Sequence, residues 1–311
     1  MTHLRVLVRP RATFGTPLVS GTLWGHLAWA MRHLHGEVAL AGWLKEQALA
    51  PWLISSAMPE GFLPRPLLVP SGLQREGVAA HESAKRVRRL RWVPEHAFTA
   101  LRNAMSARAL DEALERWVGL EGAGDDAHEI AVRTTHNSID RRISSTPERG
   151  GLYVSEGWLP AKPGARMQLF AATPEDRRGV FEELVGFVAE HGYGRDASTG
   201  SGVFDFEISQ ADEFFAAKGN RAMSLAHGTV SATMREPRYR LHTHYGRLGS
   251  YFAQSADTPF KRPILMAVPG ATFGGDREER FGTLLGGVHP ADARVVHHAL
   301  HLPLWFSEAA Q

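Results

Sequence analysis

A glycine-rich stretch, residues 192–202, combines residue types that suit a phosphate-binding loop. It reads Gly-Tyr-Gly-Arg-Asp-Ala-Ser-Thr-Gly-Ser-Gly and lies between an expected helix end and an expected strand. Glycine allows the main chain to approach a phosphate backbone and point N–H groups at it, while hydroxyl and guanidinium groups add donors. We predict such contacts, with a flexible surface turn as the alternative, for Gly192, Gly194, Arg195, Ser198, Thr199, Gly200, Ser201 and Gly202.

Two common phosphate-binding motifs do not fit this loop. No Gly-Lys-Ser/Thr follows it, so it is not a P-loop. A dinucleotide fingerprint needs a strand, then the glycines, then a helix, whereas here the helix comes first. The loop is therefore predicted to bind a phosphate backbone without nucleotide hydrolysis or hydride transfer.

A second polar group lies near the basic and mobile tip of a hairpin, which two expected strands, residues 130–143 and 151–158, flank. Guanidinium forks suit phosphates, and amide or imidazole groups suit base edges. We predict nucleic-acid or subunit contact here, with a solvated turn as the alternative. The residues concerned are Arg133, His136, Asn137, Arg141 and Arg142.

Catalysis and metal binding have weaker support. The chain has 16 histidines, and His136 is the candidate general acid or base, because it alone lies beside arginines in the expected RNA-facing loop. His297, His298 and His301 lie in an expected strand, where side chains alternate between faces. A two-metal site needs carboxylates on adjacent, well-ordered strands, whereas the turn Gly124–Asp126 lies in an acidic loop after an expected helix and the turn Gly274–Asp276 has a single acid. We assign no catalytic residue, no metal ligand and no cofactor.

These groups need a scaffold, and the hydrophobic patterns predict one. Alternation and helical spacing indicate strand, helix, strand, strand, helix, strand, which is the split βαβ order. Its helices should cover one face of the sheet and leave the other free. The expected elements are a strand at 4–8, helices from Ser20 or Thr22 to Gly36 and at 38–49, strands at 52–55 and 166–170, a helix started by Thr173-Pro174 and closed by Gly192, and a strand at 204–208.

The fold class is predicted as α+β, with two ferredoxin-like (RRM-like) domains. The first spans residues 1–212 and carries a helical insertion at about 71–128, which includes the basic run Lys85 to Arg91. The second spans residues 213–311 and is strand-dominated or degenerate, with strands expected at 238–244, 264–268 and 295–304.

Composition limits the function classes. The 311 residues are 43% hydrophobic and 22% charged with a net charge of +2, which is typical of a folded globular protein. There are 30 arginines against 5 lysines, a bias that suits phosphate and base stacking but also follows from a GC-rich genome. No cysteine is present, which excludes disulfides and thiolate chemistry. We expect a cytoplasmic protein with no signal peptide and no membrane span.

The helix, glycine loop and strand of residues 173–208 resemble the RAMP superfamily of CRISPR proteins. Within it, the whole chain is similar to the family of the fourth Csm subunit of type III-A effector complexes. Gly21 departs from the family, which more often has an acid there. The matching stretches are Ser20-Gly21-Thr22-Leu23-Trp24-Gly25, Leu63-Pro64-Arg65-Pro66-Leu67, Arg88-Arg89-Leu90-Arg91-Trp92-Val93-Pro94, His136-Asn137-Ser138-Ile139-Asp140-Arg141, Gly151-Leu152-Tyr153, the loop Gly194 to Gly202, Tyr245-Gly246-Arg247, Phe260-Lys261-Arg262-Pro263-Ile264 and Pro269-Gly270-Ala271-Thr272-Phe273.

This resemblance implies a non-catalytic subunit that holds the crRNA 5′ handle. Its expected partners are the crRNA, the large polymerase-like subunit, a backbone RAMP subunit and, indirectly, the target RNA. The glycine loop would hold phosphates, Arg195, Arg141 and Arg142 would supply charge, and Asn137 would read a base. Two alternatives stay open: a metal-independent RAMP endoribonuclease that uses His136, and a stand-alone single-strand RNA-binding protein.

Overall fold

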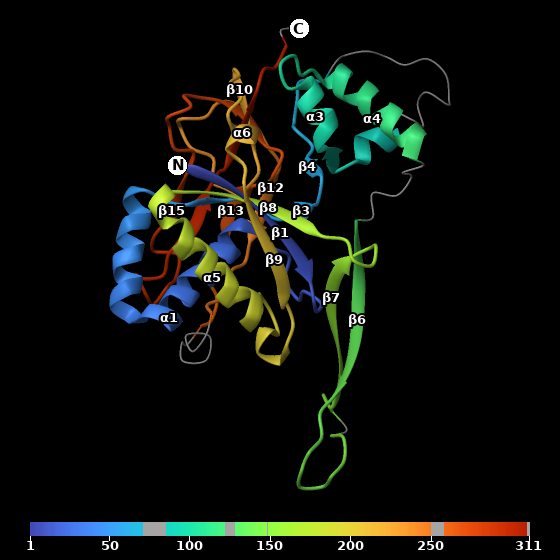
Figure 1. Cartoon of the computed structure of the whole chain (residues 1–311). Coiled ribbons are helices and arrows are strands. Elements are labelled where there is room, and N and C mark those ends of the chain that lie inside the picture. The colour runs from blue at the N-terminus through green and yellow to red at the C-terminus, as the bar shows by residue number, and fades with distance from the viewer. Residues whose placement is uncertain (71–84, 122–127, 148, 250–257, 310–311) are drawn as a thin grey trace.

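The computed structural model describes residues 1–70, 85–121, 128–147, 149–249 and 258–309. The chain is an α+β protein that contains several antiparallel sheets (Figure 1). In the described residues no helix is long and apolar enough to cross a membrane.

The main sheet has the strand order β2-β8-β1-β9, and β3 also pairs with β8. Helix α1 follows β1 and helix α5 follows β8, so this part of the chain has the predicted split βαβ order. Both helices lie on one face of the sheet (Figure 1). The strands are β1 (Thr2–Pro10), β2 (Leu53–Ile54), β3 (Met58–Pro59), β8 (Met167–Thr173) and β9 (Phe204–Gln210), and the helices are α1 (Ser20–Leu49) and α5 (Arg178–His191).

The second face of the main sheet is not free, contrary to expectation. Every residue of β8 is buried. Leu169 and Ala171 face the core under the two helices. Phe170 and Ala172 face a second core, shared with Phe98 and with apolar residues near the C-terminus such as Leu304 and Phe306. An apolar strand without alternation is typical of a strand covered on both faces, and here later parts of the chain supply the second cover.

Two predicted helix starts differ in detail. Ser20 does not cap α1; its buried hydroxyl accepts a hydrogen bond from the His227 N–H at 3.1 Å. Thr173 is the last residue of β8, its hydroxyl makes no hydrogen bond among the described residues, and a short 3-10 turn, η1 (Glu175–Arg177), precedes α5. Gly36 interrupts α1 at φ +87°, which agrees with two helices predicted on either side of it. A tertiary hydrogen bond thus replaces the predicted cap at Ser20, while Thr173 belongs to the strand and caps no helix.

The predicted insertion is described only in part. Strand β4 (Phe62–Pro64), which precedes the insertion, pairs with β5 (Trp92–Pro94) inside it, and two helices follow β5, α3 (Glu95–Leu101) and α4 (Ala107–Glu121). The acidic turn Gly124–Asp126 lies outside the described residues. After it comes a long two-stranded hairpin, β6 (Glu129–Asn137) and β7 (Leu152–Pro160), which projects from the body (Figure 1).

The C-terminal part is strand-rich, and its described residues contain no helix after α6 (Asp212–Phe215). Two predicted strands are each divided between sheets: residues 238–244 give β11 and β12, and residues 295–304 give β16 and β17. The division into domains 1–212 and 213–311 stays a prediction. The strands are β10 (Arg221–Ser224), β11 (Arg235–Arg238), β14 (Thr272–Gly274) and β17 (Pro303–Phe306) in the order β11-β14-β10-β17, the pair β12 (Leu241–His244) and β13 (Ile264–Ala267), and the pair β15 (Gly282–Leu285) and β16 (His297–Leu300).

Candidate nucleic-acid interface

The glycine loop is an ordered turn held against the segment between β1 and α1. Gly192 and Gly202 are buried with φ of +87° and +71°. A Cβ on Gly202 would collide with the Tyr193 main chain, and one on Gly194 would lie 2.6 Å from the Thr16 Cβ. Positive φ and close approach both require glycine at these positions, so the loop glycines set the shape of the turn.

The buried side chain of Tyr193 stabilises this turn. Its side chain is fully buried, its hydroxyl donates to the Pro17 carbonyl at 2.8 Å, and it accepts from the Val19 N–H at 3.1 Å. Burial raises the pKa of this phenol above its usual value, so the group stays protonated as a donor. The neighbouring Gly194 N–H donates to His26 Nε2 at 3.0 Å, and burial lowers the pKa of His26 to about 4. A neutral His26 is the form that accepts this bond.

Most main-chain donors of the loop are already used within the protein. The N–H groups of residues 192–195 and 199–202 all donate to protein acceptors, for example Gly202 to the Thr13 carbonyl at 2.8 Å. Within the loop, only the N–H groups of residues 196–198 make no such bond to the described part of the chain. The exposed Ser198, Thr199 and Arg195 side chains are therefore better placed to meet a phosphate than the glycine amides. Contact of the loop residues with RNA stays a prediction.

Arg195 joins the loop to the projecting hairpin. Its side chain packs over Gly15, and its Nη2 donates to the main-chain carbonyl of Glu156 on β7. Arg133 on β6 lies beside it and binds the Glu156 carboxylate at 2.8 Å. Arg133, Val154, Glu156 and Arg195 line one open depression at this junction. Two of the predicted RNA-contact arginines, 62 positions apart in the sequence, thus share one surface feature.

The hairpin stem is a regular antiparallel ladder that presents His136 and Tyr153 opposite each other. Their rings stack with centroids 5.0 Å apart, and His136 Nε2 lies 2.7 Å from the Ser155 hydroxyl. Such cross-strand pairs stabilise a ladder, and Tyr153, 52% exposed, offers a free ring surface for stacking. Sequence reasoning missed Tyr153 and Glu156, although their positions on the alternating strand 151–158 were a usable signal.

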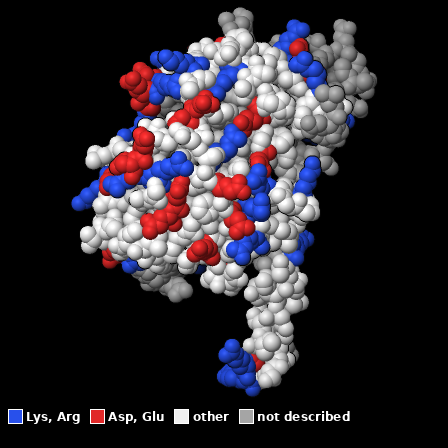
Figure 2. All heavy atoms as spheres, in the orientation of Figure 1, with Lys and Arg blue, Asp and Glu red and all other residues white. Residues whose placement is uncertain are grey.

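The tip of the hairpin carries the remaining predicted residues. Asn137 accepts a hydrogen bond from the Thr146 hydroxyl at 2.9 Å, and the Arg142 N–H donates to Asp140 at 2.9 Å. Arg141 and Arg142 are exposed. Figure 2 shows basic side chains gathered at the end of the projection, beyond a stem with few charges. The structure therefore places His136, Asn137, Arg141 and Arg142 along the hairpin, away from the junction that holds Arg133 and Arg195.

The other histidine and acidic candidates occupy different environments. His297, His298 and His301 are buried; His298 Nε2 lies 2.9 Å from the Trp52 carbonyl and His301 Nδ1 lies 2.7 Å from the Ser224 hydroxyl. The turn after β14 keeps its Asp276 carboxylate in a local bond to the Glu278 N–H. Across the residues that the structure describes, no group of histidines and acids has the arrangement of a metal site.

Comparison with known proteins identifies the fold. No protein-family model matches the chain, and no curated protein sequence matches it. It is similar to a chain in the crystal structure of a Csm1-Csm4 cassette in complex with cA4, at TM-score 0.62 and 16% identity, covering 99% of this chain and 100% of that one. It is also similar to a chain in a Csm3-Csm4 subcomplex of the type III-A CRISPR-Cas interference complex, at TM-score 0.58 and 14% identity, covering 97% and 99%. Both complexes contain Csm4, so over its full length the chain has the fold of Csm4, a subunit of the type III-A CRISPR-Cas interference complex.

Proposed function

We propose that this chain is a crRNA-binding structural subunit of a type III-A effector complex, where it holds the 5′ handle and bridges the large polymerase-like subunit to a backbone RAMP subunit. Support comes first from the fold, because its full-length relatives occur in complexes with Csm1 and with Csm3. The observation that carries the RNA-binding part is the junction at Glu156. There the glycine loop and the hairpin stem meet through Arg195 and Arg133.

The junction has the properties that single-stranded RNA recognition uses. Guanidinium groups at its floor can hold phosphates, and the exposed Tyr153 ring on the adjoining strand can stack on a base. The basic tip extends the same hairpin further from the body. A lone two-stranded hairpin is marginally stable in water. A bound RNA or a neighbouring subunit would supply the contacts that this hairpin lacks in the isolated chain.

A binding and cleavage assay tests the proposal against the endoribonuclease alternative. Purified protein is incubated with labelled RNA from a CRISPR repeat in EDTA, with and without His136→Ala. We expect the RNA to bind intact to both proteins, because the described contacts of His136 are the Ser155 hydroxyl and the Tyr153 ring. Cleavage that disappears in His136→Ala would instead establish the ribonuclease. Association of the chain with a large polymerase-like subunit in the cell separates the proposal from a stand-alone RNA-binding protein.

Substitution of Arg195 tests the role of the junction. Arg195→Ala is expected to weaken RNA binding and to reduce the slope of log affinity against log salt by about 0.7, the value for one phosphate contact to a single strand. Binding is measured by fluorescence anisotropy from low to high salt. Arg108→Ala is the matched control, because Arg108 is an exposed arginine of α4 with a carboxylate partner, Glu112. An Arg195→Ala slope equal to that of the control would refute a phosphate contact at this residue.

A further inference from the structure

Four histidines that the proposed RNA interface does not use form a cluster near the start of α1. His227 lies 5.8 Å from His242, His242 lies 6.4 Å from His244, and His244 lies 4.9 Å from His297, measured between ring centroids. They come from three places: the loop after β10, strand β12 and strand β16. We call these four residues the histidine cluster.

Strand geometry and local bonds hold the cluster in place. His242 and His244 are two residues apart on β12, so their side chains leave the same face of the strand. His227 is oriented by a 2.8 Å contact of its Nδ1 with the Ser56 hydroxyl. His297 is 2% exposed and packs against α1, where a Cβ on Gly21 would lie 2.8 Å from its Nε2. The exposed His242 opens the cluster to solvent.

The cluster contains a buried polar atom without a partner. His297 Nε2 makes no hydrogen bond to any described residue. Buried nitrogen atoms of this kind are costly unless a ligand or water satisfies them. Because the ring of His244 is its neighbour and His242 lies beyond at the surface, the unsatisfied atom belongs to a row of imidazoles that reaches solvent.

The charges around the cluster have one sign. Lys261, in the segment that leads into β13, lies close to His244 and His297; its Nζ donates to the Val296 carbonyl at 3.0 Å. Arg91, which also interacts with Glu129, lies near His227. Among the described residues, the charges that lower the pKa of His227, His244 and His297 are those of Lys261, Arg91 and neighbouring imidazoles. An anion placed among them would relieve this repulsion.

The same repulsion affects protonation. Burial and the neighbouring cations lower the pKa of His227 to about 3, of His244 to about 4 and of His297 to about 2, and burial lowers the pKa of Lys261 to about 8. An anion bound at the edge of the cluster would favour the protonated form of the imidazoles and so raise these pKa values. Anion binding and proton uptake are therefore coupled.

We propose that the histidine cluster and Lys261 form a phosphate-binding site separate from the glycine loop, with binding coupled to proton uptake. A phosphate group fits because its oxygens accept hydrogen bonds from imidazolium and ammonium donors. The phosphate can belong to an RNA backbone or to a free nucleotide. A backbone phosphate is the source that the geometry favours, since the glycine loop contacts the same end of α1 through His26 and Val19.

Calorimetry with pyrophosphate as the probe tests the site. Affinity for the full chain is expected to rise as the pH falls from 7.5 to 6.5, by up to about tenfold for each proton taken up. Titrations in buffers of different ionisation enthalpy should show this proton uptake directly. His242→Gln, at an exposed position that leaves the core intact, should weaken binding at least about fivefold and reduce the pH dependence. His242→Arg should retain binding, because arginine supplies N–H donors to a phosphate at this exposed position.

A control variant and a competition experiment with RNA complete the test. His96→Gln, an exposed histidine of α3 outside the cluster, should bind pyrophosphate like the parent chain. Competition between pyrophosphate and a single-stranded RNA that is also sensitive to His242→Gln would identify a backbone phosphate; pyrophosphate binding without competition would identify a free phosphate. The proposal is overturned by no measurable binding at pH 6.5, or by binding that is equal in His242→Gln and insensitive to pH. A negative result at the histidine cluster does not change the expected salt dependence of Arg195→Ala. The histidine cluster and the glycine loop are therefore tested independently.

Discussion

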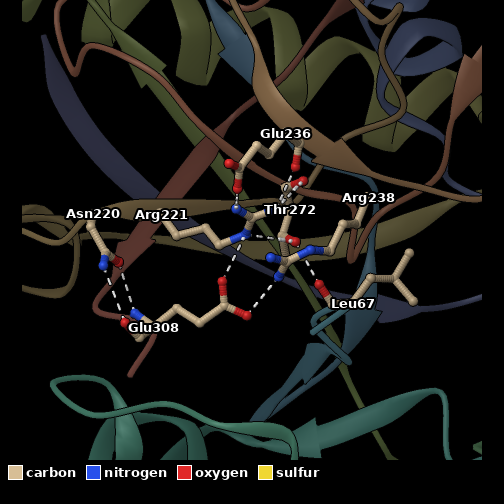
Figure 3. A network of polar contacts seen from close by, with 7 residues as sticks. All are labelled: Leu67, Asn220, Arg221, Glu236, Arg238, Thr272 and Glu308. Carbon is tan, nitrogen blue, oxygen red and sulfur yellow. Dashed lines mark hydrogen bonds and ion pairs between the residues drawn. The ribbon is translucent and has the colours of Figure 1, made fainter. Parts of the chain in front are cut away.

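Glu308→Gln is expected to lower the free energy of unfolding by about 3–5 kcal/mol, the usual result of removing one partner from a buried ion pair. Figure 3 shows the network concerned. Glu308 binds Arg238 at 2.6 Å and lies 3.4 Å from Arg221, whose side chain is only 6% exposed. Glu236 also approaches Arg221, but at 3.9 Å and from an exposed position. Without the Glu308 charge, the positive charges of Arg221 and Arg238 would lie close together with little neutralisation by a carboxylate.

The position of these residues explains the size of the effect. Burial lowers the pKa of Arg221, and repulsion from Arg238 lowers it further, while Glu308 and Glu236 act in the opposite direction. Arg221 is part of β10, the strand between β14 and β17, and Glu308 lies two residues after the end of β17. Asn220 fixes Glu308 through hydrogen bonds to its main-chain N–H and carbonyl, at 2.8 Å and 3.1 Å (Figure 3). The pair therefore joins the last strand to the middle of its sheet.

Urea unfolding followed by circular dichroism measures this prediction. The matched control is Glu112→Gln, which removes an exposed carboxylate from the (i, i+4) pair with Arg108 on α4. Exposed helical pairs contribute about 0.3–0.5 kcal/mol, so this control should unfold almost like the parent chain. A loss in Glu308→Gln as small as in the control would show that the buried pair does not hold the C-terminal strands.

Acidification is expected to unfold the protein cooperatively between pH 6 and pH 5. Burial, with repulsion by neighbouring cations at some sites, lowers the pKa of six histidines from 6.5 to about 4 or below; they are His26, His227, His244, His297, His298 and His301. Below pH 6.5 the unfolded chain therefore binds more protons than the folded chain. Stability is present in full above pH 6.5 and is lost as the pH falls towards the folded values, by up to about 1.4 kcal/mol per pH unit for each such proton. Two net protons are enough to remove several kcal/mol.

The pH at which stability starts to fall identifies the groups responsible. Loss caused by histidines begins near pH 6.5, whereas loss caused by paired carboxylates begins below about pH 4. His297→Leu should move the acid midpoint to lower pH, because it removes a buried imidazole whose Nε2 makes no hydrogen bond to the described residues. His96→Leu, at an exposed position, should leave the midpoint unchanged. A stability that stays constant from pH 7 to pH 4.5 would contradict the prediction.

Local sequence patterns predicted the elements whose periodicity is undisturbed. Leu4, Val6 and Val8 are the alternating buried residues of β1. Phe181, Leu184 and Val188 form the buried stripe of α5. The predicted strand at 204–208 is β9. These patterns record which face of an element is buried, so they are sufficient for the split βαβ order.

Features that depend on distant segments were not predictable in this way. The face of β8 that points away from the helices is covered by residues such as Leu304 and Phe306, more than a hundred positions away. The main-chain amides of the glycine loop were expected to be free for phosphate, but those of Gly202, Gly194 and Arg195 already donate to Thr13, His26 and Thr16. The junction of Arg133 and Arg195 exists only because the hairpin returns to the glycine loop. The sequence identified both arginines as candidate RNA contacts, but it did not indicate that they lie side by side.

Amide hydrogen exchange of the full chain, with and without single-stranded RNA from a CRISPR repeat, tests the central claim most directly. The glycine loop and the hairpin are proposed to bind the same RNA, so residues 129–160 and 192–202 should both become protected while α4 exchanges as before. The exposed hairpin should show the larger change, since its stem has few contacts with the body in the free chain. RNA binding that protects other segments and leaves both of these unchanged would contradict the proposed interface.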